Sequence, residues 1–109
     1  MNRYHPMILM VSLLPLTVQA GPVLDGKELY DRWCASCHAP GPGHPGTQAL
    51  KALYQEALPA ALEQRLDLAP GVIEYVVRNG RSTMPSFRKT EINDEQLNAI
   101  GAYLSKPKP

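Results

Sequence analysis

The sequence predicts a small all-α domain, and three observations lead to that fold class. Helix-capping residues recur along the 109-residue chain, with Asp25 and Asn93 each standing directly before a stretch of helical spacing. Segments rich in proline and glycine separate the helical stretches, and these residues end helices or form turns. No segment shows the alternation of apolar and polar residues that predicts a β-strand. A chain of this length holds one domain, and neither a repeat nor a linker divides it.

The first 20 residues are predicted to be a signal peptide outside the folded domain. Residues 7–16 are almost wholly apolar, and residues 18–20 offer the small or modest side chains that signal peptidase reads. An uncleaved anchor is the alternative, but the apolar stretch is shorter than the roughly 20 residues that span a bilayer, and Pro15 interrupts it. We therefore expect a cleaved leader at residues 1–20, export to the periplasm, and a domain without a membrane span at residues 21–109.

The first helix is predicted over residues 25–33. Asp25 can cap it, and Leu29 and Trp33 share one face because they lie four residues apart. Residues 39–46 contain proline or glycine at most positions, so we expect a rigid loop there.

Short helices are predicted next at residues 50–57 and 60–66. Pro70 suits the first turn of a helix over residues 71–78, since its missing N–H group is not needed there. Gly80 ends this helix, because glycine tolerates positive φ.

The last helix is predicted after a loop at residues 81–90. Asn93 can form a capping box with Gln96, and the two acidic residues between them suit the positive end of a helix dipole. The apolar stripe expected to face the core consists of Leu97, Ile100, Gly101 and Leu104.

The segment from Trp33 to His38, with the sequence WCASCH, carries the chemistry of the chain. Two cysteines separated by two residues and followed by histidine are the signature for covalent attachment of a c-type haem. Each thiol adds to a vinyl group, and the histidine then lies under the iron as its proximal ligand. A redox dithiol and half of a zinc site are the alternatives, but the chain has neither a βαβ context nor a second ligand pair. We predict one haem c, bound through Cys34 and Cys37 with His38 on the iron.

Met84 is the expected second axial ligand of that iron. The other three methionines of the chain lie in the predicted leader. Pro85 disfavours a helical conformation at Met84, so a loop presents this side chain. The alternative is a core methionine. His44 is the rival ligand, but it follows His38 closely and is expected at the surface on the same side.

A proline carbonyl is expected to orient the proximal histidine. Pro40, Pro42 and Pro45 all lie within reach of His38 in the sequence, and a carbonyl that accepts from Nδ1–H fixes the ring. Pro42 and Pro45 are favoured, and a rigid turn without such a bond is the alternative.

The charge of the chain argues against a nucleic-acid partner. The 11 basic and 10 acidic residues become equal in number if Arg3 leaves with the leader, and no basic stretch is interleaved with aromatic residues. Four cations nevertheless surround Met84 in the sequence and are candidates to steer an acidic partner, or else to be solvated or bound to a haem propionate: Arg78, Arg81, Arg88 and Lys89.

The residues on both sides of the haem motif resemble a small class I cytochrome c. Gly26 and Tyr30 stand eight and four residues before Cys34, as in the N-terminal helix of that family. Ile100 and Tyr103 resemble the aliphatic and aromatic positions of its C-terminal helix. The resemblance implies that the two helices cross, with the glycine permitting close approach, around a covalently bound haem.

A narrower resemblance points to a partner. Residues 34–47, 65–68 and 84–92 are similar to the cytochrome subunit of p-cresol methylhydroxylase-type flavocytochromes. This implies an electron-transfer protein, not itself an enzyme, that takes electrons from a flavoprotein subunit oxidising para-alkylphenols. It would pass them to a downstream periplasmic acceptor. The alternatives are a free-diffusing electron carrier and, from another class, a haem enzyme or sensor in which Met84 is not bound.

Overall fold

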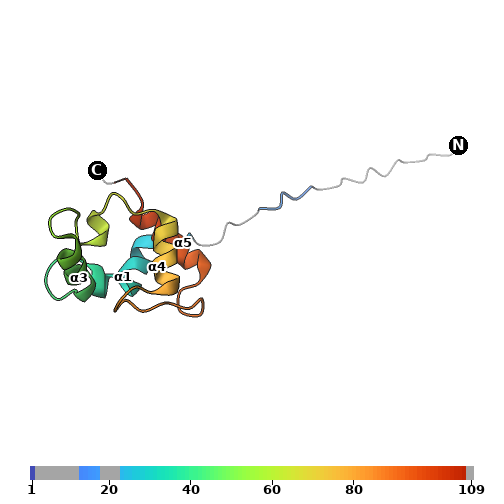
Figure 1. Ribbon diagram of the computed structural model, residues 1–109. Coiled ribbons are helices and arrows are strands. Elements are labelled where there is room, and N and C mark those ends of the chain that lie inside the picture. Colours follow the sequence, from blue (N-terminus) through green and yellow to red (C-terminus); the bar gives the residue numbers. More distant parts are fainter. Residues whose placement is uncertain (2–12, 18–22, 108–109) are drawn as a thin grey trace.

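The computed structural model describes residues 1, 13–17 and 23–107, and helices are its regular elements (Figure 1). The elements are α1 (Gly26–Trp33), α2 (Ala35–His38), α3 (Pro45–Tyr54), the 3₁₀ turn η1 (Leu62–Gln64), α4 (Pro70–Asn79) and α5 (Asp94–Leu104). No strand occurs among the described residues, where the only β-type pairing is an isolated bridge between Arg81 and Met84. The predicted all-α class is confirmed.

The predicted leader, residues 1–20, lies mostly outside the described residues, and its cleavage stays a prediction. Within the described part of the chain, no helix is long and apolar enough to cross a membrane.

The caps predicted for the first and last helices are present. The Asp25 carboxylate accepts hydrogen bonds from the backbone N–H groups of Lys27 and Glu28, at 2.9 and 3.3 Å. Asn93 and Gln96 form the reciprocal capping box at the start of α5. Each bond satisfies an N–H group that has no partner within its own helix, and this is why these helices begin where they do.

Helices α1 and α5 cross at Gly26, as the resemblance implied. A Cβ atom at this position would overlap the Ala99 carbonyl oxygen and lie 2.8 Å from Tyr103 Cβ. The rings of Tyr30 and Tyr103 pack with their centroids 5.8 Å apart on the neighbouring turns. Only glycine therefore allows the two backbones to approach this closely.

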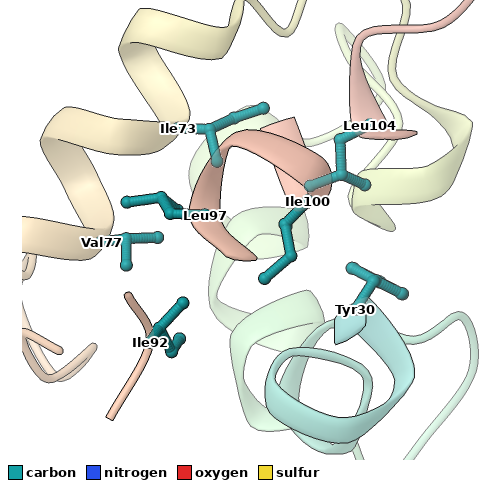
Figure 2. Packing of buried hydrophobic residues seen from close by; sticks show 7 residues of the cluster. All are labelled: Tyr30, Ile73, Val77, Ile92, Leu97, Ile100 and Leu104. Carbon is teal, nitrogen blue, oxygen red and sulfur yellow. The ribbon is translucent and has the colours of Figure 1, made fainter. Parts of the chain in front are cut away.

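The hydrophobic core lies where α1, α4 and α5 meet (Figure 2). Its buried side chains come from those three helices and from the segment before α5: Tyr30, Ile73, Val77, Ile92, Leu97, Ile100 and Leu104. The four residues of the predicted α5 stripe are all buried. Helix α3 is set apart from α4 and α5 (Figure 1), and the one residue it buries is Thr47.

The predicted boundaries in the middle of the chain were partly wrong. Helix α3 begins at Pro45, inside the expected loop of residues 39–46, and ends at Tyr54 before Gln55, which has a φ of 52°. Residues 60–66 form only the single turn η1. By contrast, Pro70 begins α4 and Gly80 ends it with a φ of 71°, as predicted.

Candidate functional site

The two cysteines lie on one helical turn. The Cys34 carbonyl accepts hydrogen bonds from the N–H groups of Cys37 and His38, at 3.1 and 2.9 Å, so the spacing of the motif becomes the short helix α2. Both thiols are free; Cys34 is half-buried and Cys37 is exposed. Burial, and next the neighbouring Cys37, raise the pKa of Cys34 to about 11, so its thiol is protonated at neutral pH.

His38 is buried, and its surroundings fix both its backbone and its ring. The Tyr30 hydroxyl donates to the His38 carbonyl at 3.2 Å, and the Thr47 hydroxyl donates to the next carbonyl, that of Ala39, at 2.8 Å. The ring lies against Gly46, where a Cβ atom would come within 2.7 Å of Cε1 and 2.9 Å of Nδ1. Burial lowers the pKa of His38 and favours the neutral imidazole, the form that binds a metal.

The hydrogen bond expected between His38 and a proline carbonyl is absent. The buried Nδ1 atom has no hydrogen-bond partner. Pro40 and Pro42 are exposed, and Pro45 is the first residue of α3, so its carbonyl points along that helix. Gly46 occupies the place beside the ring instead.

His44 lies next to α2, on the side expected from the sequence. Its Nδ1 atom is 2.9 Å from the Ser36 carbonyl oxygen. The residue is half-buried and its contact with Ser36 lies at the surface, in keeping with the expected surface position. It precedes α3 as that helix's cap residue, so its contact with Ser36 joins the start of α3 to α2.

Met84 ends a tight turn after α4. The backbones of Arg81 and Met84 exchange two hydrogen bonds, of 3.1 and 2.9 Å, and Ser82 between them has a φ of 54°. A Cβ atom at Gly80 would lie 2.8 Å from the Met84 carbonyl oxygen. The predicted loop setting is confirmed; the Met84 side chain is half-buried and packs beside the core.

The four cations near Met84 do not share one environment. Arg88 and Lys89 have exposed side chains that pair with Glu91 and Asp94, respectively. Arg78 is only 18% exposed and donates to the carbonyl oxygens of Phe87 and Ile92. Of the alternatives open for this group, steering a partner suits the exposed Arg88 and Lys89 better than Arg78, whose guanidinium is bound inside the fold. The carbonyl partners of Arg78 could not be predicted from the sequence.

The residues around α2 fit a covalently bound haem. Two free thiols and a buried neutral imidazole with an unpartnered nitrogen follow one another on a single turn. A shallow hollow lies elsewhere, along α4 and residues 80–81, and neither the cysteines nor His38 nor Met84 lines it. Among the described residues, no group of three or more histidine, cysteine, aspartate or glutamate side chains is placed to hold a metal ion by itself. The site defines a protein of the covalent-haem class, with the porphyrin attached through cysteine thioethers.

Comparison with known proteins identifies the family. Residues 21–104 match the sequence family described as cytochrome c oxidase, cbb3-type, subunit III. The 4-cresol dehydrogenase [hydroxylating] cytochrome c subunit of Pseudomonas putida is 35% identical over 80 residues, which cover 73% of this chain and 58% of that protein. Cytochrome c6 of Cladophora glomerata is 31% identical over 87 residues, which cover 80% of this chain and 90% of that cytochrome. Cytochrome c6 of Nostoc sp. is 33% identical over 85 residues.

The chain belongs to the class I c-type cytochromes. Its cofactor is covalently bound haem c, and it is a monohaem electron carrier. The chain spans 58% of the length of the Pseudomonas putida subunit.

Proposed function

We propose that this chain is a periplasmic cytochrome that accepts electrons from a flavoprotein dehydrogenase acting on para-alkylphenols. It then passes them singly to a downstream periplasmic acceptor. The observation that carries the proposal is the 35% identity to a protein named as the cytochrome c subunit of 4-cresol dehydrogenase. In this proposal residues 1–20 are removed on export, and residues 21–109 form the working domain.

The proposed site uses four residues. Cys34 and Cys37 would hold the haem through thioethers, and His38 and Met84 would be its two protein ligands to iron. When bound, the haem supplies a one-electron Fe(III)/Fe(II) couple. Gly46 and the Tyr30 hydroxyl keep His38 in place. Two protein ligands would leave no open position on the iron for a substrate, and this favours electron transfer over catalysis.

Replacement of Met84 tests the ligand set. Met84→Ala is expected to keep the haem through acid–acetone extraction, because the cysteines are untouched. It should lose the near-infrared charge-transfer band of ferric Met ligation, bind carbon monoxide, and have a lower reduction potential, since a thioether stabilises the ferrous state. Met84→His is the matched variant, which should restore six-coordination without restoring the potential. An unchanged spectrum and potential in Met84→Ala would make Met84 a packing residue and favour the haem enzyme or sensor alternative.

A free-diffusing carrier is the second candidate. The cytochrome c6 of Cladophora glomerata is matched over 90% of its length, and its name specifies no enzyme subunit. The two candidates differ in whether a flavoprotein binds the cytochrome stably.

The test mixes purified ferric cytochrome with 4-cresol and the flavoprotein subunit of the Pseudomonas putida enzyme, without oxygen. The flavoprotein proposal predicts rapid haem reduction that requires the flavoprotein, together with a complex in gel filtration. Reduction without a complex favours the free carrier. No reduction in the presence of active flavoprotein contradicts the proposed partner.

A further inference from the structure

Phe87, three residues after Met84, is fixed at its backbone and at its ring. Its N–H group donates to the Val77 carbonyl at 2.8 Å, and its own carbonyl accepts from Arg78 Nη1 at 3.1 Å. Its ring meets the Trp33 ring edge-on, with 6.2 Å between centroids and 79° between planes. The turn at Arg81 fixes one end of the Met84 segment, and Phe87 fixes the other.

Arg78 joins three parts of the chain through one guanidinium. Besides Phe87, it donates to the Ile92 carbonyl at 2.8 Å and to Asp94 Oδ1 at 2.9 Å. The planar fork of arginine reaches these separate acceptors at once, and a lysine ammonium at the same position has no such fork. A largely buried guanidinium bound to carbonyl groups is therefore placed to fix residues 87–92 and not to meet a partner.

Trp33 supplies the contact from the opposite side. Its indole N–H is buried without a hydrogen-bond partner, so packing orients the ring. The ring lies against the hydrophobic core, with Phe87 on its edge and the Arg32 guanidinium 5.4 Å from its centroid. Trp33 directly precedes Cys34, so its contact with Phe87 joins the segment of the cysteines and His38 to the segment of Met84.

We propose that Arg78 and Trp33 are positioning residues that keep Met84 on the iron by fixing Phe87. This inference rests on the proposed ligation by Met84. When Phe87 is loosened, the Met84 segment leaves the iron more often, and an external ligand competes for the vacated position more successfully.

Imidazole binding to the ferric holoprotein at neutral pH tests this directly. The near-infrared band reports Met84 ligation, and its loss on titration gives the association constant of imidazole. Arg78→Lys and Trp33→Leu are each expected to raise that constant about tenfold, the effect of losing one charge-assisted hydrogen bond or aromatic contact. Trp33→Phe keeps the aromatic contact and should restore the wild-type constant.

Two further variants show whether Phe87 transmits the effect. In a Phe87→Leu background, Trp33→Leu should raise the imidazole association constant little further, because the contact between the two aromatic rings is already lost. Arg88→Gln is the matched control, since Arg88 follows Phe87 but is 81% exposed, and its imidazole constant should stay that of the wild type.

Guanidinium unfolding of the same holoproteins separates positioning from general stability. Variants that unfold earlier but bind imidazole as the wild type does would overturn the inference while leaving Met84 ligation intact. A wild type without the near-infrared band would overturn Met84 ligation itself, and this inference with it. If Trp33→Leu fails to retain haem because it adjoins Cys34, Arg78→Lys decides the question alone.

Discussion

The missing side chain at Gly46 shapes the proximal side of the site. Gly46 is the second residue of α3, and its Cα lies so close to the His38 ring that a methyl group would not fit. The ring is thus confined by a helix that follows it in the chain. Such steric confinement orients the imidazole in the absence of a hydrogen bond to Nδ1.

Gly46→Ala is therefore expected to displace the imidazole or α3. A Cβ atom 2.7 Å from Cε1 and 2.8 Å from the Cys37 carbonyl oxygen forces a shift, and overpacking of this kind costs about 1–3 kcal/mol of unfolding free energy. Denaturant unfolding and the electron paramagnetic resonance of the ferric haem measure the two effects. Gly71→Ala is the control, because no atom lies within 4 Å of a Cβ there. Equal behaviour of both variants would show that Gly46 does not confine the ring.

Sequence can predict a feature of the site when that feature depends on residues that are neighbours in the chain. The spacing of Cys34, Cys37 and His38 predicts their single helical turn, and Gly80 and Pro85 predict the loop setting of Met84. The binding of iron by His38 and Met84 stays a prediction. Gly46 was not found, because its role appears only when α3 folds back onto α2. The same holds for Arg78, whose acceptors lie 9 to 16 residues further along the chain.

The crossing of α1 and α5 is the most extensive contact between helices. It depends on a small residue, Gly26, and on a large one, Tyr103. Gly26→Val should separate the helices, since the Cβ position is occupied by the Ala99 carbonyl. Tyr103→Ala should lower the unfolding free energy by about 3–5 kcal/mol, the usual cost of removing a packed aromatic side chain. Thermal and denaturant unfolding of the holoprotein measure both.

Tyr103→Phe is the matched control for this crossing. It keeps the ring beside Tyr30 and removes only the hydroxyl, which donates to the Glu63 carboxylate. A Tyr103→Ala variant no less stable than Tyr103→Phe would mean that ring packing contributes nothing to the crossing.

The N-terminus of α5 gives a prediction for acid stability. A hydrogen bond from Lys89, followed by one from Arg78, lowers the pKa of Asp94 below its ordinary value of 3.8. Because the folded-state pKa is the lower one, this carboxylate stabilises the fold above pH 3.8 and stops doing so as the pH falls through the folded-state value. Asp94→Asn should thus lower stability at neutral pH and make it less sensitive to acid.

Unfolding free energies measured from neutral pH down to below 3.8 test the Asp94 prediction. Glu95→Gln removes the same charge from the same turn while leaving the pairs of Asp94 with Lys89 and Arg78 in place. If both variants show the same pH dependence, net charge and not the ion pairs sets the acid stability.

Elements were predicted well where capping residues mark them and poorly where packing decides. Asp25, Asn93 and Pro70 gave the starts of α1, α5 and α4. The start of α3 was missed because Pro45 and Gly46, the first residues of the helix, look like part of a loop. Residues 60–66 have helical composition but form only η1, since Ala61 and Arg65 are buried in an extended segment around that turn.

At the scale of the whole molecule, the hydrophobic core is built by only some of the helices. The large buried apolar side chains belong to α1, α4, α5 and the segment before α5 (Figure 2). Among the described residues, α2 and α3 bury only His38 and Thr47. Large apolar side chains stay exposed both on α3, such as Leu53, and on α4, such as Tyr75. A domain of this size gains only a small free energy of unfolding from such a core, and a covalently bound porphyrin would add apolar contacts that the polypeptide lacks.

Removal of the haem is therefore expected to unfold most of the chain, beginning with α3. A Cys34→Ser/Cys37→Ser double variant, produced without haem, should lack a cooperative thermal transition, because binding of the cofactor is coupled to folding. Amide hydrogen exchange should find α3 unprotected, since it packs mainly against α2 and contributes no residue to the core cluster of α1, α4 and α5. Any residual protection should lie in α1 and α5, which still have the Gly26 crossing. The holoprotein is the reference, and its α3 amides should be protected. A haem-free chain that melts cooperatively, with α3 as protected as α5, would show that the polypeptide core suffices and that the haem only occupies a preformed site.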